Sequence, residues 1–203
     1  MTFTKRIPKM LIYSRFAIGL IILSCSIFHI KNYSAVAVTL FTIGLLTDIF
    51  DGIIARSLNV SNEKLRRLDS TIDLFFFIAV AVAAFISSPQ FFYENKIELS
   101  ILIGAEATAY LVCFFKFKKE IATHSISSKV WALILFATIV QLMMTKTSSI
   151  LFQVCFYLGV VTRVEIIFII LVLRHWTSDV PGLFQAIRLR QGKPMKRHKL
   201  FNG

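Results

Sequence analysis

Long apolar runs alternate with short polar segments along this chain. A membrane-spanning helix needs about 20 mostly apolar residues, and six stretches meet that requirement. The predicted spans are residues 10–29, 33–55, 69–88, 98–115, 130–146 and 150–173. The runs are long and lack the apolar–polar alternation of membrane strands. The pattern therefore predicts an all-α bundle of six transmembrane helices.

Composition agrees with a membrane protein. Hydrophobic residues make up 56% of the 203 residues, whereas a soluble domain has about 45–50%. The net charge is +12, but the apolar residues come in long runs, which excludes a nucleic-acid-binding module. The three cysteines lie inside apolar runs, so we expect no disulfide framework. The basic N-terminus has no small-residue cleavage site after it, which favours a retained first helix over a signal peptide.

Basic residues concentrate in alternate loops. They are dense before the first span, between the second and third, between the fourth and fifth, and after the sixth. The opposite loops hold only Lys31, Lys96 and Lys146. The positive-inside rule then places both termini in the cytosol. We expect a multi-pass integral membrane protein of a bacterial-type inner membrane.

The residues after the sixth span predict a smaller, peripheral part. Leu183, Phe184 and Ile187 would share one face of a short helix, with arginines at headgroup level. The basic tail beyond it is expected to bind anionic membrane lipid. We expect residues 1–177 to form the six-helix transmembrane domain and residues 178–203 to form an interfacial helix and a basic cytosolic tail.

Four aspartates are the most informative polar residues. Asp48 and Asp51 lie at the expected cytosolic end of the second span, and Asp69 and Asp73 open the third, whose helix could begin a turn earlier, near Leu65. Carboxylates in membrane helices are costly and indicate a functional site. Spacings of three and four residues put each pair on one helix face, and the antiparallel return of the chain lets the two faces meet. Such carboxylates repel each other, and oxygen-only ligands favour Mg²⁺, Mn²⁺ or Ca²⁺ over Zn²⁺.

The neighbours of the first pair point to a phosphate-bearing ligand. Gly52 and Ala55 are small enough to let a ligand approach the helix backbone. Arg56 follows directly, and its forked guanidinium suits phosphate oxygens. Metal ligands, open backbone and arginine together indicate a pyrophosphate substrate. The simpler interpretation, aspartates that only face water at helix ends, explains one such residue better than four.

The segment from Asp48 to Asp73 resembles the signature of the CDP-alcohol phosphatidyltransferases. It reads D-I-F-D-G-I-I-A-R, then eight residues, then L-R-R-L-D-S-T-I-D. The family pattern is D-x-x-D-G-x-x-A-R, eight residues, and G-x-x-x-D-x-x-x-D. Every spacing and seven of the eight signature residues match, and Leu65 replaces the second glycine. A weaker likeness covers most of the chain, including Ile7 to Leu11 before Arg15, Ser128-Lys129, and Asp179 to Pro181.

The resemblance implies a fold, a reaction and roles for residues. It implies six transmembrane helices with short interfacial helices at both ends, a homodimer, and two divalent ions, Mg²⁺ or Mn²⁺. The reaction would move a phosphatidyl group from CDP-diacylglycerol, or a related CDP-alcohol, to a small alcohol and release CMP, in phospholipid biosynthesis. Asp48, Asp51 and Asp69 would be metal ligands, and Asp73 the general base, also touching a metal. The nucleotide would contact Asp51, Gly52, Ala55, Arg56 and Leu65.

Leu65 departs from the family pattern. It stands one turn before Asp69 and fills space that a glycine would leave open. The nucleotide then sits differently, or the donor differs, or activity is reduced. Because all four aspartates are present, we expect an active enzyme. Arg15, inside the first span, is expected to extend towards lipid phosphate.

The acceptor alcohol is indicated less directly. Lys129 and Arg163 could hold an acceptor phosphate, such as that of glycerol 3-phosphate. Alternatively, Arg163 is a buried partner of Glu165 or Glu106. Both interpretations stay open at this point.

Two other classes of protein share some of these features. A prenyltransferase-like enzyme also uses Asp-rich motifs, Mg²⁺ and pyrophosphate, but those motifs lie on well-separated helices of a longer bundle. A non-enzymatic cation carrier would place acidic residues near mid-membrane, whereas these lie at one edge. The phosphatidyltransferase is therefore the favoured interpretation.

Overall fold

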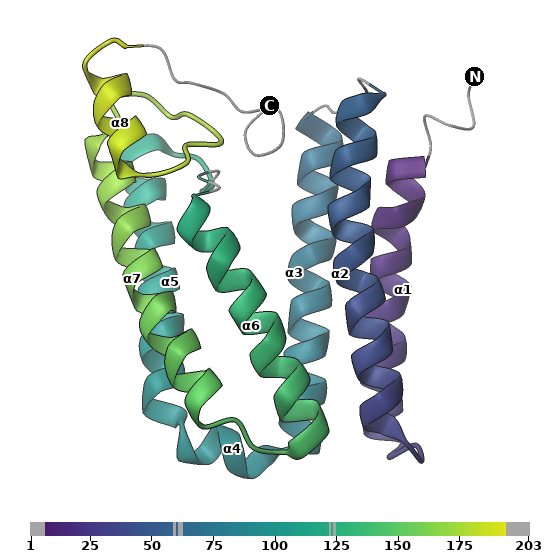
Figure 1. The fold of residues 1–203 in the computed structure, drawn as a ribbon. Coiled ribbons are helices and arrows are strands. Elements are labelled where there is room, and N and C mark those ends of the chain that lie inside the picture. The colour runs from purple at the N-terminus through teal and green to yellow at the C-terminus, as the bar shows by residue number, and fades with distance from the viewer. Residues whose placement is uncertain (1–6, 59, 61–62, 122, 124, 194–203) are drawn as a thin grey trace. The chain divides into compact units, whose positions relative to one another are not determined.

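The computed structural model describes residues 7–58, 60, 63–121, 123 and 125–193. These residues form eight helices and no strand (Figure 1). The helices are α1 (Ile7–Ile27), α2 (Tyr33–Ser57), α3 (Glu63–Ser87), α4 (Pro89–Glu94), α5 (Lys96–Phe117), α6 (Ile126–Thr145), α7 (Ile150–Val172) and α8 (Leu183–Arg190). Six of them, all except α4 and α8, are long and apolar enough to cross a membrane. The predicted six-span, all-α fold is thus confirmed.

The helix bounds differ from the prediction where charged residues extend a helix beyond its apolar run. Helix α3 begins at Glu63, six residues before the predicted start of that span, so both of its aspartates lie inside a formed helix. Helix α1 begins at Ile7, and Pro8 lies in its first turn, where a proline costs no hydrogen bond. The short helix α4 was not predicted, and it also begins with a proline, Pro89.

The helices divide into two compact units, each with its own core. The first unit contains α1, α2 and α3, with the start of α4 and the end of α6. Within it, α1 packs against both α2 and α3 (Figure 1). Its buried apolar side chains include Ile12, Ile22, Phe41 and Phe76. Because α1 touches both of its neighbours, a side chain on α1 can reach residues of α2 and α3 at once.

The second unit contains α5, most of α6, α7 and α8. Helices α5 and α7 pack together, and their core includes Ala109, Cys113, Ile166 and Ile170. The Nζ of Lys116 donates hydrogen bonds to the last carbonyls of α7, at 2.9 Å and 2.7 Å. This places a positive charge at the negative end of the α7 dipole.

Helix α8 folds back onto the end of α7. Ala186 is buried in a cluster with Ile169, Leu173 and Val180, and Leu183 packs against it. Phe184 and Ile187 are 68% and 40% exposed. Leu183 lies one turn before Ile187 in α8 but is half-buried, because it packs against this cluster.

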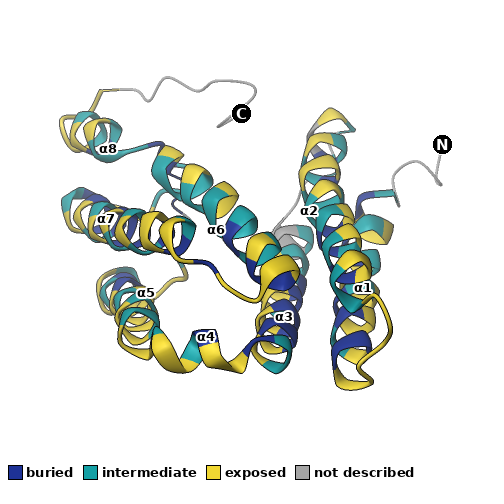
Figure 2. Ribbon diagram, turned by 60° about the horizontal axis from the view of Figure 1, so that its bottom comes forward, coloured by how far each residue is buried: buried dark blue, intermediate teal, exposed yellow. Residues whose placement is uncertain are grey.

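Exposed positions occur along the long helices of both units (Figure 2), and many of them are large apolar residues. Examples are Ile103, Phe115 and Ile150, which are 70%, 69% and 81% exposed. So many exposed large apolar side chains would be unfavourable in water. On helices of spanning length it is the surface that lipid covers, and the protein is a multi-pass integral membrane protein.

Candidate active site

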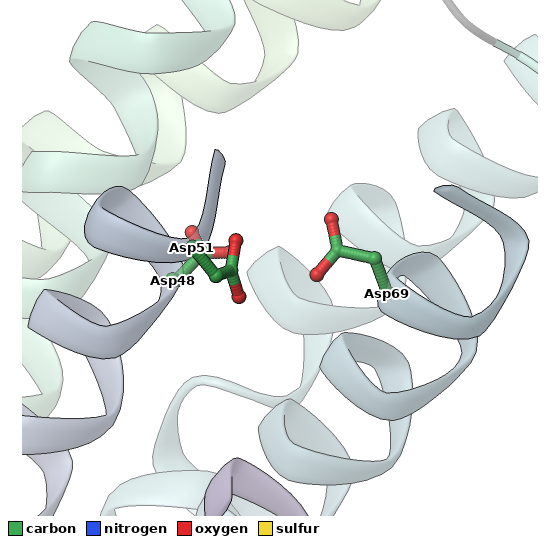
Figure 3. Close-up of side chains that lie close together, drawn as sticks. All are labelled: Asp48, Asp51 and Asp69. Carbon is green, nitrogen blue, oxygen red and sulfur yellow. The ribbon is translucent and has the colours of Figure 1, made fainter. Parts of the chain in front are cut away.

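The four aspartates converge in the first unit. Asp48 and Asp51 are three residues apart near the C-terminal end of α2, and Asp69 and Asp73 are four residues apart in the first half of α3. Carboxylate oxygens of Asp48, Asp51 and Asp69 lie within 4.8 Å of one another. Figure 3 shows the two α2 carboxylates facing Asp69 across the space between the helices. We call Asp48, Asp51, Asp69 and Asp73 the acidic cluster.

Arg15 on α1 lies at the centre of the acidic cluster. Its Nη1 contacts Asp48 and Asp73, and its Nη2 contacts Asp51 and Asp69, the last at 2.6 Å. Only 1% of the Arg15 side chain is exposed. The expectation that Arg15 extends towards lipid phosphate was wrong. Since α1 packs against both α2 and α3, the residue points into the bundle, and the attraction of four carboxylates exceeds that of the interface.

The carboxylates of the acidic cluster differ in exposure. The Asp51 side chain is 4% exposed, whereas those of Asp73, Asp69 and Asp48 are 26%, 34% and 41% exposed. Three of the four side chains are therefore partly accessible to a ligand. One guanidinium neutralises only one of the four carboxylates when all are ionised, so the cluster keeps a strong preference for added cations.

The donor set fits a hard divalent cation. Three oxygens within 4.8 Å of one another are close enough to bind one ion together, because Mg²⁺ and Mn²⁺ take oxygen ligands at about 2.0–2.2 Å. Asp48 and Asp51 come from one helix and Asp69 from another, so such an ion would also link α2 and α3. Asp73 lies on the same face as Asp69, one turn further along α3.

The expected nucleotide-binding residues lie on the same two helices. Gly52 is half-buried beside Asp51, and Ala55 is buried. Arg56 is also in α2, but its side chain lies outside the described part of the chain. Leu65 is half-buried, one turn before Asp69 on α3. Their contact with a nucleotide stays a prediction.

The expected acceptor-binding residues lie in the second unit, where Arg163 has two close contacts. Its Nε donates to Glu106, and its guanidinium lies over the ring of Trp131, 4.1 Å from the centroid. Glu165, the other possible partner, accepts a hydrogen bond from Ser127 instead. Arg163 therefore pairs with Glu106 and not with Glu165. An acceptor role for Arg163 stays a prediction.

Lys129 is half-buried in the first turn of α6. Its backbone N–H donates to the carbonyl of Ser125 at 3.3 Å. A role in acceptor binding stays a prediction for Lys129 as well.

Sequence reasoning missed two members of these arrangements, Arg15 and Trp131. The signal for Arg15 was available, because an ionised side chain inside a span usually pairs with another. Trp131 gave no such signal, since an aromatic residue in an apolar run is common. Its role follows from packing: its Nε1 donates to the carbonyl of Cys155 at 3.0 Å, which holds the ring beneath Arg163.

Comparison with known proteins identifies a family. The family model for CDP-alcohol phosphatidyltransferase matches residues 5–177, which include the acidic cluster and all six spans. No curated protein and no solved structure matches the chain at a significant level. The match covers most of the 203 residues. The chain therefore belongs to the CDP-alcohol phosphatidyltransferase family, whose members are phosphotransferases for substituted phosphate groups.

Proposed function

We propose that this enzyme transfers a phosphatidyl group from CDP-diacylglycerol to a small phosphorylated alcohol, with glycerol 3-phosphate as the favoured type of acceptor, and releases CMP. The observation that carries the proposal is the convergence of four carboxylates from α2 and α3 at one partly open site. That arrangement suits a substrate in which a pyrophosphate must be held and split.

Asp48, Asp51 and Asp69 are proposed to hold Mg²⁺ or Mn²⁺, with Asp73 contributing, and two ions as the family resemblance implies. When bound, the ions would neutralise the pyrophosphate and stabilise the charge that develops on the departing CMP. The nearly complete burial of Asp51 supports its role as a fixed ligand, because a buried carboxylate has few alternative positions and little access to water.

Asp73 is proposed as the general base. In the transfer, a bond forms between the acceptor oxygen and the lipid-linked phosphorus, and the bond from that phosphorus to the CMP oxygen breaks. The proton of the acceptor hydroxyl passes to the Asp73 carboxylate. Its position one turn beyond Asp69 and its partial exposure support this role, because the base must reach both the reacting phosphorus and an incoming alcohol.

The remaining assignments rest on sequence position. Gly52, Ala55, Arg56 and Leu65, with Asp51, are proposed to contact the cytidine nucleotide and its phosphates. Lys129 and Arg163 are proposed to hold the acceptor phosphate. The known contacts of Arg163 use Nε and the flat face of the guanidinium, so the terminal nitrogens are the part proposed to meet a phosphate.

The proposal also includes the domain organisation and the membrane topology of the protein. Residues 1–177 would form the catalytic domain, which is supported by the extent of the family match. Residues 178–203 would form the interfacial helix and basic tail. The exposed Phe184 and Ile187 support contact with the membrane interface, and Arg188 and Arg190 in the last turn of α8 support contact with anionic lipid. Both termini are proposed to be cytosolic in a bacterial-type inner membrane, and the enzyme to be a homodimer.

A product screen tests the proposed reaction. The purified enzyme in detergent, with CDP-diacylglycerol and Mn²⁺, is supplied with a panel of phosphorylated and unphosphorylated alcohols, and lipid products are identified by mass spectrometry. We expect CMP release to require both a phosphorylated acceptor and a divalent cation, and EDTA to abolish it. Asp51→Asn serves as the inactive control. Transfer only to unphosphorylated alcohols would overturn the acceptor assignment, and full activity in EDTA would overturn the metal assignment.

A further inference from the structure

Arg15 makes an unusual set of contacts for one side chain. Each terminal nitrogen touches one carboxylate from α2 and one from α3: Nη1 contacts Asp48 and Asp73, and Nη2 contacts Asp51 and Asp69. The guanidinium therefore links α1 to both α2 and α3. Within the described part of the chain, it is also a cation that contacts all four carboxylates of the acidic cluster.

Arg15 uses carboxylates that a metal ion would need. Asp48, Asp51 and Asp69 offer oxygens within 4.8 Å of one another, and each of them also contacts Arg15. A divalent cation bound among these three would be close to the guanidinium, and two positive charges at such a distance repel each other strongly in a partly buried site. It is therefore unfavourable for the guanidinium and the divalent cation to contact the same carboxylate oxygens at the same time.

The guanidinium is also incompletely satisfied. Its Nε is buried without a hydrogen-bond partner among the described residues, and a buried N–H without a partner costs free energy. Together the four carboxylates hold more negative charge than one arginine can neutralise. Two divalent ions would make the net charge of the site positive, and an anionic pyrophosphate needs a positive site. Arg15 thus stabilises the acidic cluster but does not neutralise all of its negative charge.

We propose that Arg15 is an internal counter-ion that competes with divalent cations for the acidic cluster. Without metal, it neutralises part of the cluster and holds α1, α2 and α3 together. When metal binds, the carboxylates exchange part of their contact with Arg15 for contact with the ion. This inference rests on the proposed metal site, and it adds that this arginine weakens metal affinity while it stabilises the metal-free protein.

A purely structural role for Arg15 would have a different effect on metal affinity. If Arg15 only holds the helices together, its removal loosens the carboxylates, so metal binding weakens or stays the same. If Arg15 competes with the metal, its removal takes a positive charge away from the four carboxylates, so metal binding tightens while the metal-free protein becomes less stable. The two roles therefore predict opposite changes in affinity.

Metal binding and melting, measured separately from turnover, test the proposal. The full-length protein in detergent is titrated with Mn²⁺, and free Mn²⁺ is followed by electron paramagnetic resonance. Melting temperatures are recorded in EDTA and in saturating Mn²⁺. Arg15→Met removes the charge and keeps an extended apolar chain. Arg15→Lys keeps a charge but cannot bridge four carboxylates with a fork. Lys9→Met is the matched control, because Lys9 is exposed on the same helix, with its ammonium over Tyr13.

We expect Arg15→Met to bind Mn²⁺ at least about tenfold more tightly than the wild type, because a nearby positive charge has been removed. Its melting temperature should fall in EDTA and recover most of the loss in Mn²⁺. Arg15→Lys should lie between, and Lys9→Met should match the wild type.

Three results would count against the proposal. Unchanged or weaker Mn²⁺ binding by folded Arg15→Met would overturn it in favour of a structural tie. If Arg15→Met does not fold even in saturating Mn²⁺, Arg15→Lys decides, and wild-type or weaker affinity in that variant overturns the proposal. A wild type that binds no Mn²⁺ would overturn the proposed metal site itself, and the competition with it.

Discussion

The ring of Phe76 on α3 lies where a side chain at Gly44 on α2 would be. A Cβ built on Gly44 would be 2.4 Å from Cζ of Phe76 and 2.9 Å from Cε2. Phe76 is only 2% exposed and is also 5.9 Å, centroid to centroid, from the ring of Phe41. The absence of a side chain at Gly44 therefore lets a large aromatic ring reach α2, on the same two helices that carry the acidic cluster.

We expect Gly44→Ala to destabilise the protein, because the Phe76 ring must move within a packed core. Overpacking costs about 1–3 kcal/mol, and an approach of 2.4 Å favours the upper part of that range, which exceeds the gain of about 1 kcal/mol in helix propensity. The measurement is the melting temperature in detergent. Gly104→Ala on α5 is the control, since nothing lies within 4 Å of its added Cβ, and it should be neutral or stabilising. Equal melting temperatures for the two variants would contradict the packing assigned to Phe76.

Asp73→Asn should separate the proposed base from the proposed metal ligands. The amide keeps the size and one oxygen of the side chain but cannot accept the proton of the acceptor. We expect CDP-diacylglycerol binding to be retained while turnover falls by about 10²-fold or more. Asp51→Asn, at the most buried carboxylate, should instead weaken Mn²⁺ binding. Normal turnover by Asp73→Asn would show that another group is the base.

Leu65→Gly tests the one departure from the family signature. If the nucleotide lies beside the acidic face of α3, removal of the Leu65 side chain should enlarge the site and tighten binding of the CDP-alcohol. The substitution also costs roughly 1 kcal/mol of helix propensity, so the melting temperature should fall slightly. Nucleotide titration and melting curves measure the two effects independently.

Ser70→Gly is the control for Leu65→Gly, because Ser70 is exposed on another face of α3. It should lower stability without any change in nucleotide affinity. Weaker nucleotide binding by a folded Leu65→Gly variant would mean that leucine packs usefully against the ligand. The donor would then differ from an ordinary CDP-diacylglycerol.

Arg163→Met tests the proposed acceptor site. We expect the KM for the phosphorylated acceptor to rise at least about tenfold, since a charge-assisted hydrogen bond contributes about 1.5–3 kcal/mol, while the KM for CDP-diacylglycerol changes little. Glu106→Gln is the comparison: it removes the charge of the partner but leaves the guanidinium, so it should mainly lower the melting temperature. If both variants only lower stability and leave the acceptor KM unchanged, Arg163 and Glu106 form a structural pair alone.

The sequence predicted the spans and the meeting of the aspartates for physical reasons that act locally. Apolar runs of fixed length must cross a membrane as helices, and spacings of three and four residues align Asp48 with Asp51 and Asp69 with Asp73. Helix α3 begins at Glu63, two residues before the earlier start near Leu65 that the sequence also allowed, because a helix can continue beyond the apolar run that hydropathy detects. The short helix α4 was missed because it lies between two apolar runs.

A pairing of Arg15 could be inferred from its place inside a span, but its partners could not be identified from the sequence. Whether a charged side chain on α1 points to lipid or into the bundle depends on which helices pack beside it. Here α1 packs against both helices that carry the aspartates, and the Arg15 side chain is buried between them. The partners of Arg163 were narrowed to two glutamates, but only the packing of α5 against α7 selects Glu106.

The position of Arg15 also bears on how the protein enters its membrane. During synthesis α1 is made before α2 and α3, so Arg15 emerges before any of the carboxylates that neutralise it exists. On insertion scales an arginine at the centre of a span costs about 2.5–3.5 kcal/mol, and less towards its ends. Arg15 lies in the first half of α1, a helix that is otherwise apolar enough to span a membrane. The first helix is therefore made with this charge unpaired, and the ion pairs that bury the charge are complete only once Asp73 has been translated.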